Sequence, residues 1–165
     1  MMKKNDFQTG LRLLAIVVSV GVITNIHNLA NAKETPPIFA DITIDRQFSP
    51  DPLVVRGMSG GSVPASTVNG GNKTQTGACS GFVDKEADHN LKLLNKFDYL
   101  KVQAQSPADT TMMIKGPGGT WCNDDLDGKN PGIVGEWLKG TYKIWVGSYE
   151  KGKYLPYTLK ITEDK

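Results

Sequence analysis

Short runs in which apolar and polar residues alternate constrain this chain more than any other feature. In TYKIWVGSY (141–149), Tyr142, Ile144 and Val146 fall on one face of an extended chain, and the residues between them fall on the other. PYTLKIT (156–162) alternates in the same way. An alternation with period two indicates a strand with one buried face.

Nine β-rich runs follow one another, separated by glycine, proline, asparagine and aspartate. They cover residues 52–57, 79–83, 89–94, 98–105, 110–116, 120–123, 132–137, 141–149 and 156–162. NKFD (95–98) is interpreted as a hairpin connection. Glycine and small polar residues in 58–77 argue against a helix of any length. The pattern predicts an all-β fold: an antiparallel, jelly-roll-like β-sandwich of eight or nine short strands.

The start of the chain has the pattern of an export signal. Its first residues are basic, LLAIVVSVGVI (13–23) is an apolar run, and ANA (30–32) is a small-x-small cleavage pattern. The apolar run is shorter than the about 20 residues that span a bilayer. We therefore expect no stable membrane insertion after cleavage, and a periplasmic or extracellular location.

These features predict three segments. Residues 1–32 form a signal peptide, 33–47 an N-terminal arm, and 48–165 a single domain. The whole chain has 19 Lys and Arg against 17 Asp and Glu, and 16 of each remain beyond residue 32. A near-neutral domain without a basic cluster and interleaved aromatic residues is a poor partner for nucleic acid. The 133 residues beyond the leader suffice for one core, and we expect a monomer.

Cys79 and Cys122 are the only cysteines of the chain. In an oxidising compartment an even pair predicts one disulfide, which would contribute about 4 kcal/mol by restricting the unfolded chain. Free or metal-binding thiols are the alternative. His89 is the only histidine beyond the leader, so the chain offers a poor zinc set.

The most polar stretch is WCNDDLDGKNPGI (121–133). It fits the first half of an EF-hand loop, but Val134 stands where the loop needs a bidentate glutamate. A β-loop can still offer hard oxygens to calcium, and the predicted donors are Asn123, Asp124, Asp125, Asp127 and Asn130. The alternative is a metal-free turn in which these side chains cap backbone amides.

Catalysis has few candidate residues. His89 lies beside no serine or cysteine that would identify a nucleophile, and no known nucleophile or zinc motif is present. A hydrolase using His89 and Asp125 is therefore the least favoured hypothesis, and we expect no enzyme activity.

Aromatic residues suggest a binding surface. Trp145 lies opposite the apolar face of its strand and is the best candidate for an exposed or sheet-covering ring. With Tyr149 and Tyr154 it could form a surface for carbohydrate or protein. Trp121, beside Cys122, is expected in the core or at its rim.

The stretch DTTMMIKGPGGTWCNDDLDGKNPGI and the strand GTYKIWVGS, within 109–161, resemble the bacterial pre-peptidase C-terminal domain. The likeness is greatest to small stand-alone members. FSPDPLVVRGMSGGSVPAS and CSGFVDKEADHNLKL extend the resemblance, so that it covers about residues 42–163. The family's D-x-D strand feature is represented only by Asp109, since Thr111 stands where a second acid is expected. This departure weakens a calcium site on that strand.

The resemblance implies a secreted, usually non-catalytic β-sandwich. Some relatives bind calcium, and some bind matrix or polysaccharide. We therefore expect an exported domain with a binding or accessory role at the cell envelope or outside the cell. Calcium is its one candidate cofactor, and envelope polysaccharide or secreted proteins are its candidate partners.

Overall fold

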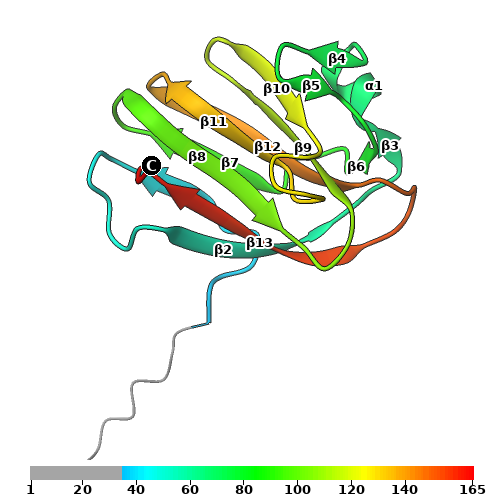
Figure 1. Cartoon of the computed structure of the whole chain (residues 1–165), viewed down its shortest axis with the longest axis horizontal. Helices are drawn as coiled ribbons and strands as arrows, with labels where there is room; N and C mark the ends of the chain where they lie inside the picture. Colours follow the sequence, from blue (N-terminus) through cyan, green and yellow to red (C-terminus); the bar gives the residue numbers. More distant parts are fainter. Residues whose placement is uncertain (1–34) are drawn as a thin grey trace, which may run out of the picture. The chain divides into compact units, whose positions relative to one another are not determined.

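The chain folds into two stacked sheets of short strands (Figure 1). The computed structural model describes residues 35–165. The predicted leader at 1–32 lies outside these residues. The first sheet contains β1 (Ile42–Ile44), β3 (Val63–Pro64), β6 (Phe82–Val83), β7 (His89–Leu93), β9 (Thr110–Gly116), β10 (Gly119–Asn123) and β12 (Gly140–Ser148). The second contains β2 (Leu53–Ser59), β8 (Phe97–Gln105), β11 (Gly132–Trp137) and β13 (Leu155–Thr162). A two-stranded ribbon is formed by β4 (Lys73–Thr74) and β5 (Gly77–Ala78), and α1 (Ala65–Asn69) is a single short helix.

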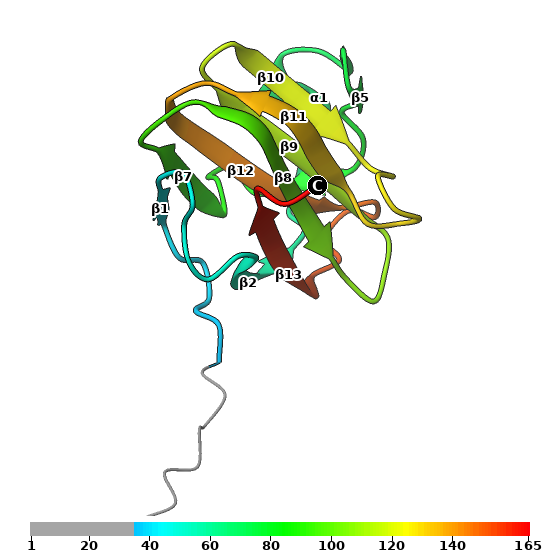
Figure 2. The same cartoon turned by 60° about the vertical axis from the view of Figure 1, so that its left-hand side comes forward.

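Strand β12 is the centre of the first sheet. It pairs with β7 and β9 and, at its end, with β6. The second sheet has the order β11-β8-β13-β2. All pairings within the sheets are antiparallel except that of β1 with β7. Figure 2 shows β1 beside β7 on one side and β10 near α1 and β5 on the other.

The main core lies between the two sheets. The predicted inward residues Tyr142, Ile144 and Val146 of β12 are buried in it. Tyr157, Leu159 and Ile161 of β13 face them from the second sheet and are buried too. The period-two alternation therefore identified the core faces of both strands correctly.

A second, smaller core covers part of the outer face of the first sheet. This outer cluster consists of Ala65, Cys79, Val83, Met113, Cys122 and Trp145. The disulfide between Cys79 and Cys122 is formed, with the two Cα atoms 5.1 Å apart, as the sequence predicted. It fastens the chain just after β5 to β10, and so holds the 60–88 segment over the sheet.

All nine predicted runs contain strands, and the structure adds β1, β3, β4 and β5. The prediction that NKFD is a hairpin connection was wrong. Strands β7 and β8 belong to different sheets, so residues 94–96 cross from one layer to the other. The expectation of no helix in 58–77 was also wrong by one turn, because α1 forms over Ala65 to Asn69 and ends at Gly70 with φ 79°.

Strand β1 lies within the predicted N-terminal arm, at 42–44, and extends the first sheet. Three residues are too short a run for alternation to reveal a strand. No helix within residues 35–165 is long and apolar enough to cross a membrane.

Candidate functional site

The acidic loop, residues 124–131, joins β10 to β11 and therefore connects the edges of the two sheets. Its tip is a tight turn in which Asp127 and Asn130 exchange two backbone hydrogen bonds of 3.1 Å. Gly128 has φ 60° within this turn, a left-handed conformation that glycine adopts without strain. The glycine in the sequence motif thus tightens a turn.

Two of the five predicted metal donors cap the backbone. Asn123 Oδ1 accepts a hydrogen bond of 3.0 Å from Gly132 N, and Asn130 Oδ1 accepts one of 3.0 Å from Ser106 N. These bonds connect the base of the loop to its own end and to the segment after β8. Side chains that bond the backbone in this way are typical of a metal-free polar turn, which is the alternative that the sequence left open.

The remaining donors are carboxylates at the surface. Asp125 and Asp127 are exposed and Asp124 is half-buried. Within residues 35–165 no three His, Cys, Asp or Glu side chains form a group that could hold a metal ion. The geometry favours the polar turn, and calcium binding by the five residues stays a prediction.

His89 lies in the main core, 1% exposed. Its Nδ1 is 3.0 Å from Ala40 O and its Nε2 is 2.8 Å from the Tyr157 hydroxyl. A carbonyl can only accept, so Nδ1 carries the proton and the tyrosine donates to Nε2. Burial lowers the pKa of His89, which favours this neutral form.

Asp88 precedes this histidine and fills a gap in the first sheet. Its Oδ2 accepts a hydrogen bond of 2.7 Å from Val146 N, beyond the last residue of β12 that pairs with β7. Burial raises the pKa of Asp88 to about 7. The pKa of Tyr157 is also raised, first by burial and then by the negative charge of Asp88. The hydrogen bond between His89 and Tyr157 thus joins the two sheets, and Asp88 lies close enough for its charge to act on the tyrosine.

Trp145 does not form an exposed ring. It is 5% exposed and packs in the outer cluster with the disulfide, because the 60–88 segment covers its face of the sheet. The prediction of an exposed Trp145 ring was therefore wrong. The alternative prediction, a ring that covers the sheet, describes its position. Tyr149 and Tyr154 are 58% and 50% exposed, and a binding role for these two tyrosines stays a prediction.

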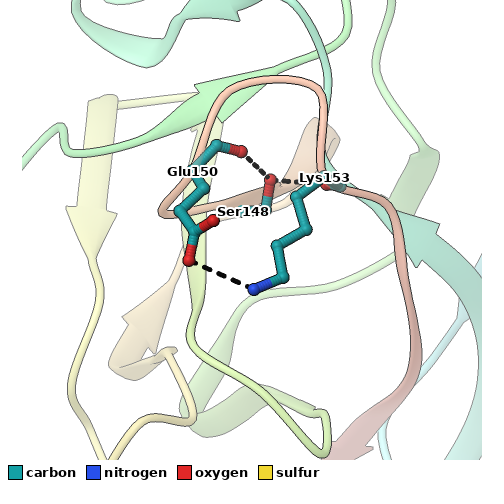
Figure 3. Close-up of polar contacts among 3 residues, drawn as sticks. All are labelled: Ser148, Glu150 and Lys153. Atoms are coloured by element: carbon teal, nitrogen blue, oxygen red, sulfur yellow. Dashed lines mark hydrogen bonds and ion pairs between the residues drawn. The ribbon is translucent and has the colours of Figure 1, made fainter.

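Tyr149 and Tyr154 flank a loop that hydrogen bonds from Ser148 hold in place. Ser148 Oγ lies 2.7 Å from Glu150 O and 2.6 Å from Lys153 O, and Lys153 Nζ pairs with Glu150 Oε1 at 3.1 Å (Figure 3). One hydroxyl proton serves the two carbonyls, so Ser148 donates to one of them at a time. The buried serine thus holds both ends of the turn at 150–153.

An aromatic groove lies where the edge strand β10 of the first sheet meets the edge strand β11 of the second. Three rings converge there, Trp121 from β10, Trp137 from β11 and Tyr142 from β12. The centroids of Trp121 and Trp137 are 6.3 Å apart, and those of Trp137 and Tyr142 are 4.9 Å apart in an edge-to-face arrangement. The groove has a volume of about 370 Å³.

Two of these rings are fixed by hydrogen bonds. Trp137 Nε1 donates to Leu100 O and Tyr142 Oη donates to Leu138 O, both at 2.9 Å. Gly116 leaves room for Tyr142, since a Cβ at this position would lie 2.2 Å from the ring. Trp121 is only half-buried, at the rim as expected, and its partly exposed ring stands over a rigid base.

The mouth of the aromatic groove combines apolar and charged groups. Val134 and Leu138 are exposed on one wall. The Glu136 carboxylate lines the same groove and pairs with Lys96 Nζ at 3.1 Å. An apolar floor with few polar groups at its rim is the usual composition of a small-ligand site.

The sequence did not reveal this groove. Trp121, Trp137 and Tyr142 come from three strands in two sheets, and their meeting depends on how the sheets stack. A partial signal was present, because Trp137 and Tyr142 stand on either side of the short connection from β11 to β12. This connection crosses from the second sheet to the first, and the rings of these two residues meet across it.

Fold and groove together define a disulfide-linked, all-β sandwich domain with an aromatic groove at the joined edges of its sheets. No family model matches the chain. An uncharacterized protein of Synechococcus elongatus is 28% identical over 110 residues, which cover 67% of this chain and 75% of that protein.

Among solved structures, the pre-peptidase C-terminal domain of collagenase from Bacillus anthracis is similar, with a TM-score of 0.43 and 10% identity. The similarity covers 78% of this chain and 99% of that domain. This neighbour comes from the family that the motifs at 109–161 resemble. The fold itself is established by the strand pairing described above.

Proposed function

We propose that this chain is an exported, non-catalytic binding module whose aromatic groove takes a sugar ring of an envelope or extracellular glycan. The observation that carries the proposal is the convergence of Trp121, Trp137 and Tyr142 on one surface groove. Buried rings fixed by hydrogen bonds form the base, and the partly exposed ring of Trp121 provides the contact surface.

The chemistry of the groove suits a sugar. One face of a pyranose ring carries C–H groups that pack on an aromatic ring, while its hydroxyls need hydrogen-bond partners at the rim. Glu136 and Thr76 supply polar atoms beside the apolar walls.

The position of His89 supports a non-catalytic role. Both ring nitrogens have partners inside the core, and the ring is 1% exposed. A general base has to reach the proton that it removes, either directly or through one water. In residues 35–165 no other histidine is present, so a Ser-His or Cys-His arrangement at the surface has no base.

Export is supported by two independent features. The basic start and apolar run at 1–23 have the composition of a signal peptide. The Cys79–Cys122 disulfide requires an oxidising compartment to persist. A glycan partner fits the periplasm or the cell exterior.

Affinity electrophoresis through gels that contain a neutral polysaccharide tests the proposal. Hydroxyethylcellulose, glucomannan and dextran are suitable probes. We expect at least one of them to retard the protein, and Trp121→Ala to abolish the retardation. The matched control Tyr149→Ala/Tyr154→Ala removes two exposed rings elsewhere and is expected to keep it. Retention of binding by Trp121→Ala, or no retardation in any of the gels, would refute the groove as a sugar site.

A further inference from the structure

The seven-stranded sheet carries positive charge and no negative charge in its strands. Its strands contain three lysines, Lys92 on β7, Lys115 on β9 and Lys143 on β12. No Asp or Glu occurs in any strand of this sheet. In the second sheet, by contrast, Asp98 and Glu136 accompany the basic residues.

The three lysines project from the same outer face. Each alternates with buried inward residues, as Lys143 does with Tyr142 and Ile144, and each lysine is exposed. Lys143 stands directly opposite Lys115 in the pairing of β12 with β9. Lys92 stands opposite Thr141 on the other side of β12. These three side chains are called the lysine row.

The lysine row has no neutralising partners. Ion pairs within residues 35–165 are made by Lys96 and Lys153, and none involves the row. Acids flank β1, where Asn90 donates to Asp41 Oδ1 and Asn95 donates to Asp45 Oδ1, and Asp88 beside β12 accepts from Val146 N. These three carboxylates are thus engaged in hydrogen bonds.

The position of the lysines lowers the stability of the sheet, and protection of a sheet edge from aggregation does not explain it. Like charges directly opposite on neighbouring strands, with Cβ atoms about 5 Å apart, destabilise a sheet. Lysines do protect exposed sheet edges from aggregation. Lys143, however, lies on β12, which is paired on both sides. A bound anion would offset the repulsion between Lys143 and Lys115.

Other outward residues add polar groups to this surface. Asn90, Thr120 and Thr141 lie beside the lysines at outward positions. They offer short hydrogen-bonding groups, and Met113 and Trp145, further along the same face, are buried in the outer cluster. Membrane surfaces are bound by larger basic clusters or by apolar anchors, and single-stranded nucleic acid by aromatic rings that stack with bases.

We propose that the lysine row binds an anionic polysaccharide, an extended polymer with carboxylates at regular intervals. The partner lies across β7, β12 and β9, so that successive carboxylates meet Lys92, Lys143 and Lys115. Neighbouring strands are about 4.8 Å apart, which places the ammonium groups in a closely spaced series. This surface lies on the outer face of the first sheet and does not depend on the aromatic groove.

The test measures binding of the mature domain to polygalacturonate by isothermal titration at low ionic strength. The variant Lys92→Gln/Lys115→Gln/Lys143→Gln is expected to weaken binding at least tenfold and to reduce its salt dependence. The matched control Lys101→Gln/Lys151→Gln/Lys160→Gln removes the same charge from other surfaces and is expected to bind nearly as the parent does. Trp121→Ala is expected to keep this binding, which separates it from the groove.

Three results would overturn the proposal. The first is absence of polygalacturonate binding by the parent protein, and the second is equal weakening in the lysine-row variant and its control. The third is binding to phosphatidylserine vesicles or single-stranded DNA in preference to the polysaccharide. Thermal unfolding of each variant accompanies the titrations, and lysine-row variants are expected to melt at or above the parent temperature because like-charge repulsion is removed.

Discussion

His89 Nε2 and the Tyr157 hydroxyl lie 2.8 Å apart and form a buried hydrogen bond between the two sheets. His89 belongs to β7 of the first sheet and Tyr157 to β13 of the second. Gly57, paired with Tyr157, leaves the room that the ring needs, since a Cβ there would lie 2.3 Å from the tyrosine. A polar bond thus fixes how two apolar faces stack.

Removing the hydroxyl is expected to destabilise the protein. Tyr157→Phe leaves His89 Nε2 buried without a donor, which costs about 1–3 kcal/mol. Urea unfolding measures the loss. Tyr149→Phe, at a surface position, is the control and is expected to change little. Equal stability of the two variants would show that the inter-sheet bond is unimportant.

Asp88 makes stability depend on pH. Its folded pKa, raised to about 7 from an ordinary 3.8, means that the folded state holds the proton more tightly. The resulting contribution to folding stability is complete below pH 3.8 and is lost as pH rises through 7. Asp88→Asn keeps an oxygen for Val146 N but cannot titrate, so it should gain stability relative to the parent as pH rises over this range.

The pH dependence of stability that His89 contributes has the opposite sign. Burial lowers its folded pKa below the ordinary 6.5, so its contribution is complete above pH 6.5 and is lost as pH falls through the folded pKa. Urea midpoints for the parent and Asp88→Asn across the pH range separate the two groups. A constant difference between the two proteins would contradict the burial of the Asp88 carboxyl.

Nine of the strands could be predicted from the sequence because each of them carries its own evidence. In β12 and β13 the alternation alone identifies the inward residues. The same argument failed for Trp145, because a strand pattern shows which face a residue is on and cannot show what covers that face. The cover is the 60–88 segment, held by the disulfide.

The site was less predictable than the fold. The aromatic groove assembles Trp121, Trp137 and Tyr142 from three strands, and only the stacking of the sheets brings them together. The acidic loop suggested a calcium site because short oxygen-bearing side chains occur both in turns and in calcium sites. Local sequence does not distinguish the two, whereas the bond from Gly132 N to Asn123 Oδ1 indicates the turn.

The acidic loop allows a direct test of turn against metal site. Asn123→Ala leaves Gly132 N without its acceptor, and we expect a loss of about 1 kcal/mol. Thermal unfolding in millimolar calcium and in chelator should show the same loss in both. Asp125→Asn, at an exposed position, is the control and should be neutral. A calcium-dependent rise in melting temperature that Asp125→Asn removes would establish the metal site instead.

The disulfide is expected to stabilise the sandwich strongly. The bridge spans 43 residues, so Cys79→Ala/Cys122→Ala should cost about 4 kcal/mol. Urea unfolding of this variant and of the reduced parent gives the value. An effect below about 1 kcal/mol would show that the 60–88 segment is held without the bridge.

The two tryptophans on opposite sides of the first sheet should separate stability from binding. Trp145 fills the outer cluster, so Trp145→Ala leaves a large cavity and should cost about 3–5 kcal/mol. Trp121 is half-buried at the rim of the aromatic groove, so Trp121→Ala should cost clearly less and remove polysaccharide retardation. Unfolding and affinity electrophoresis on the same samples give both quantities. If Trp121→Ala unfolds as readily as Trp145→Ala, the Trp121 ring is part of the core, and the groove loses its contact surface.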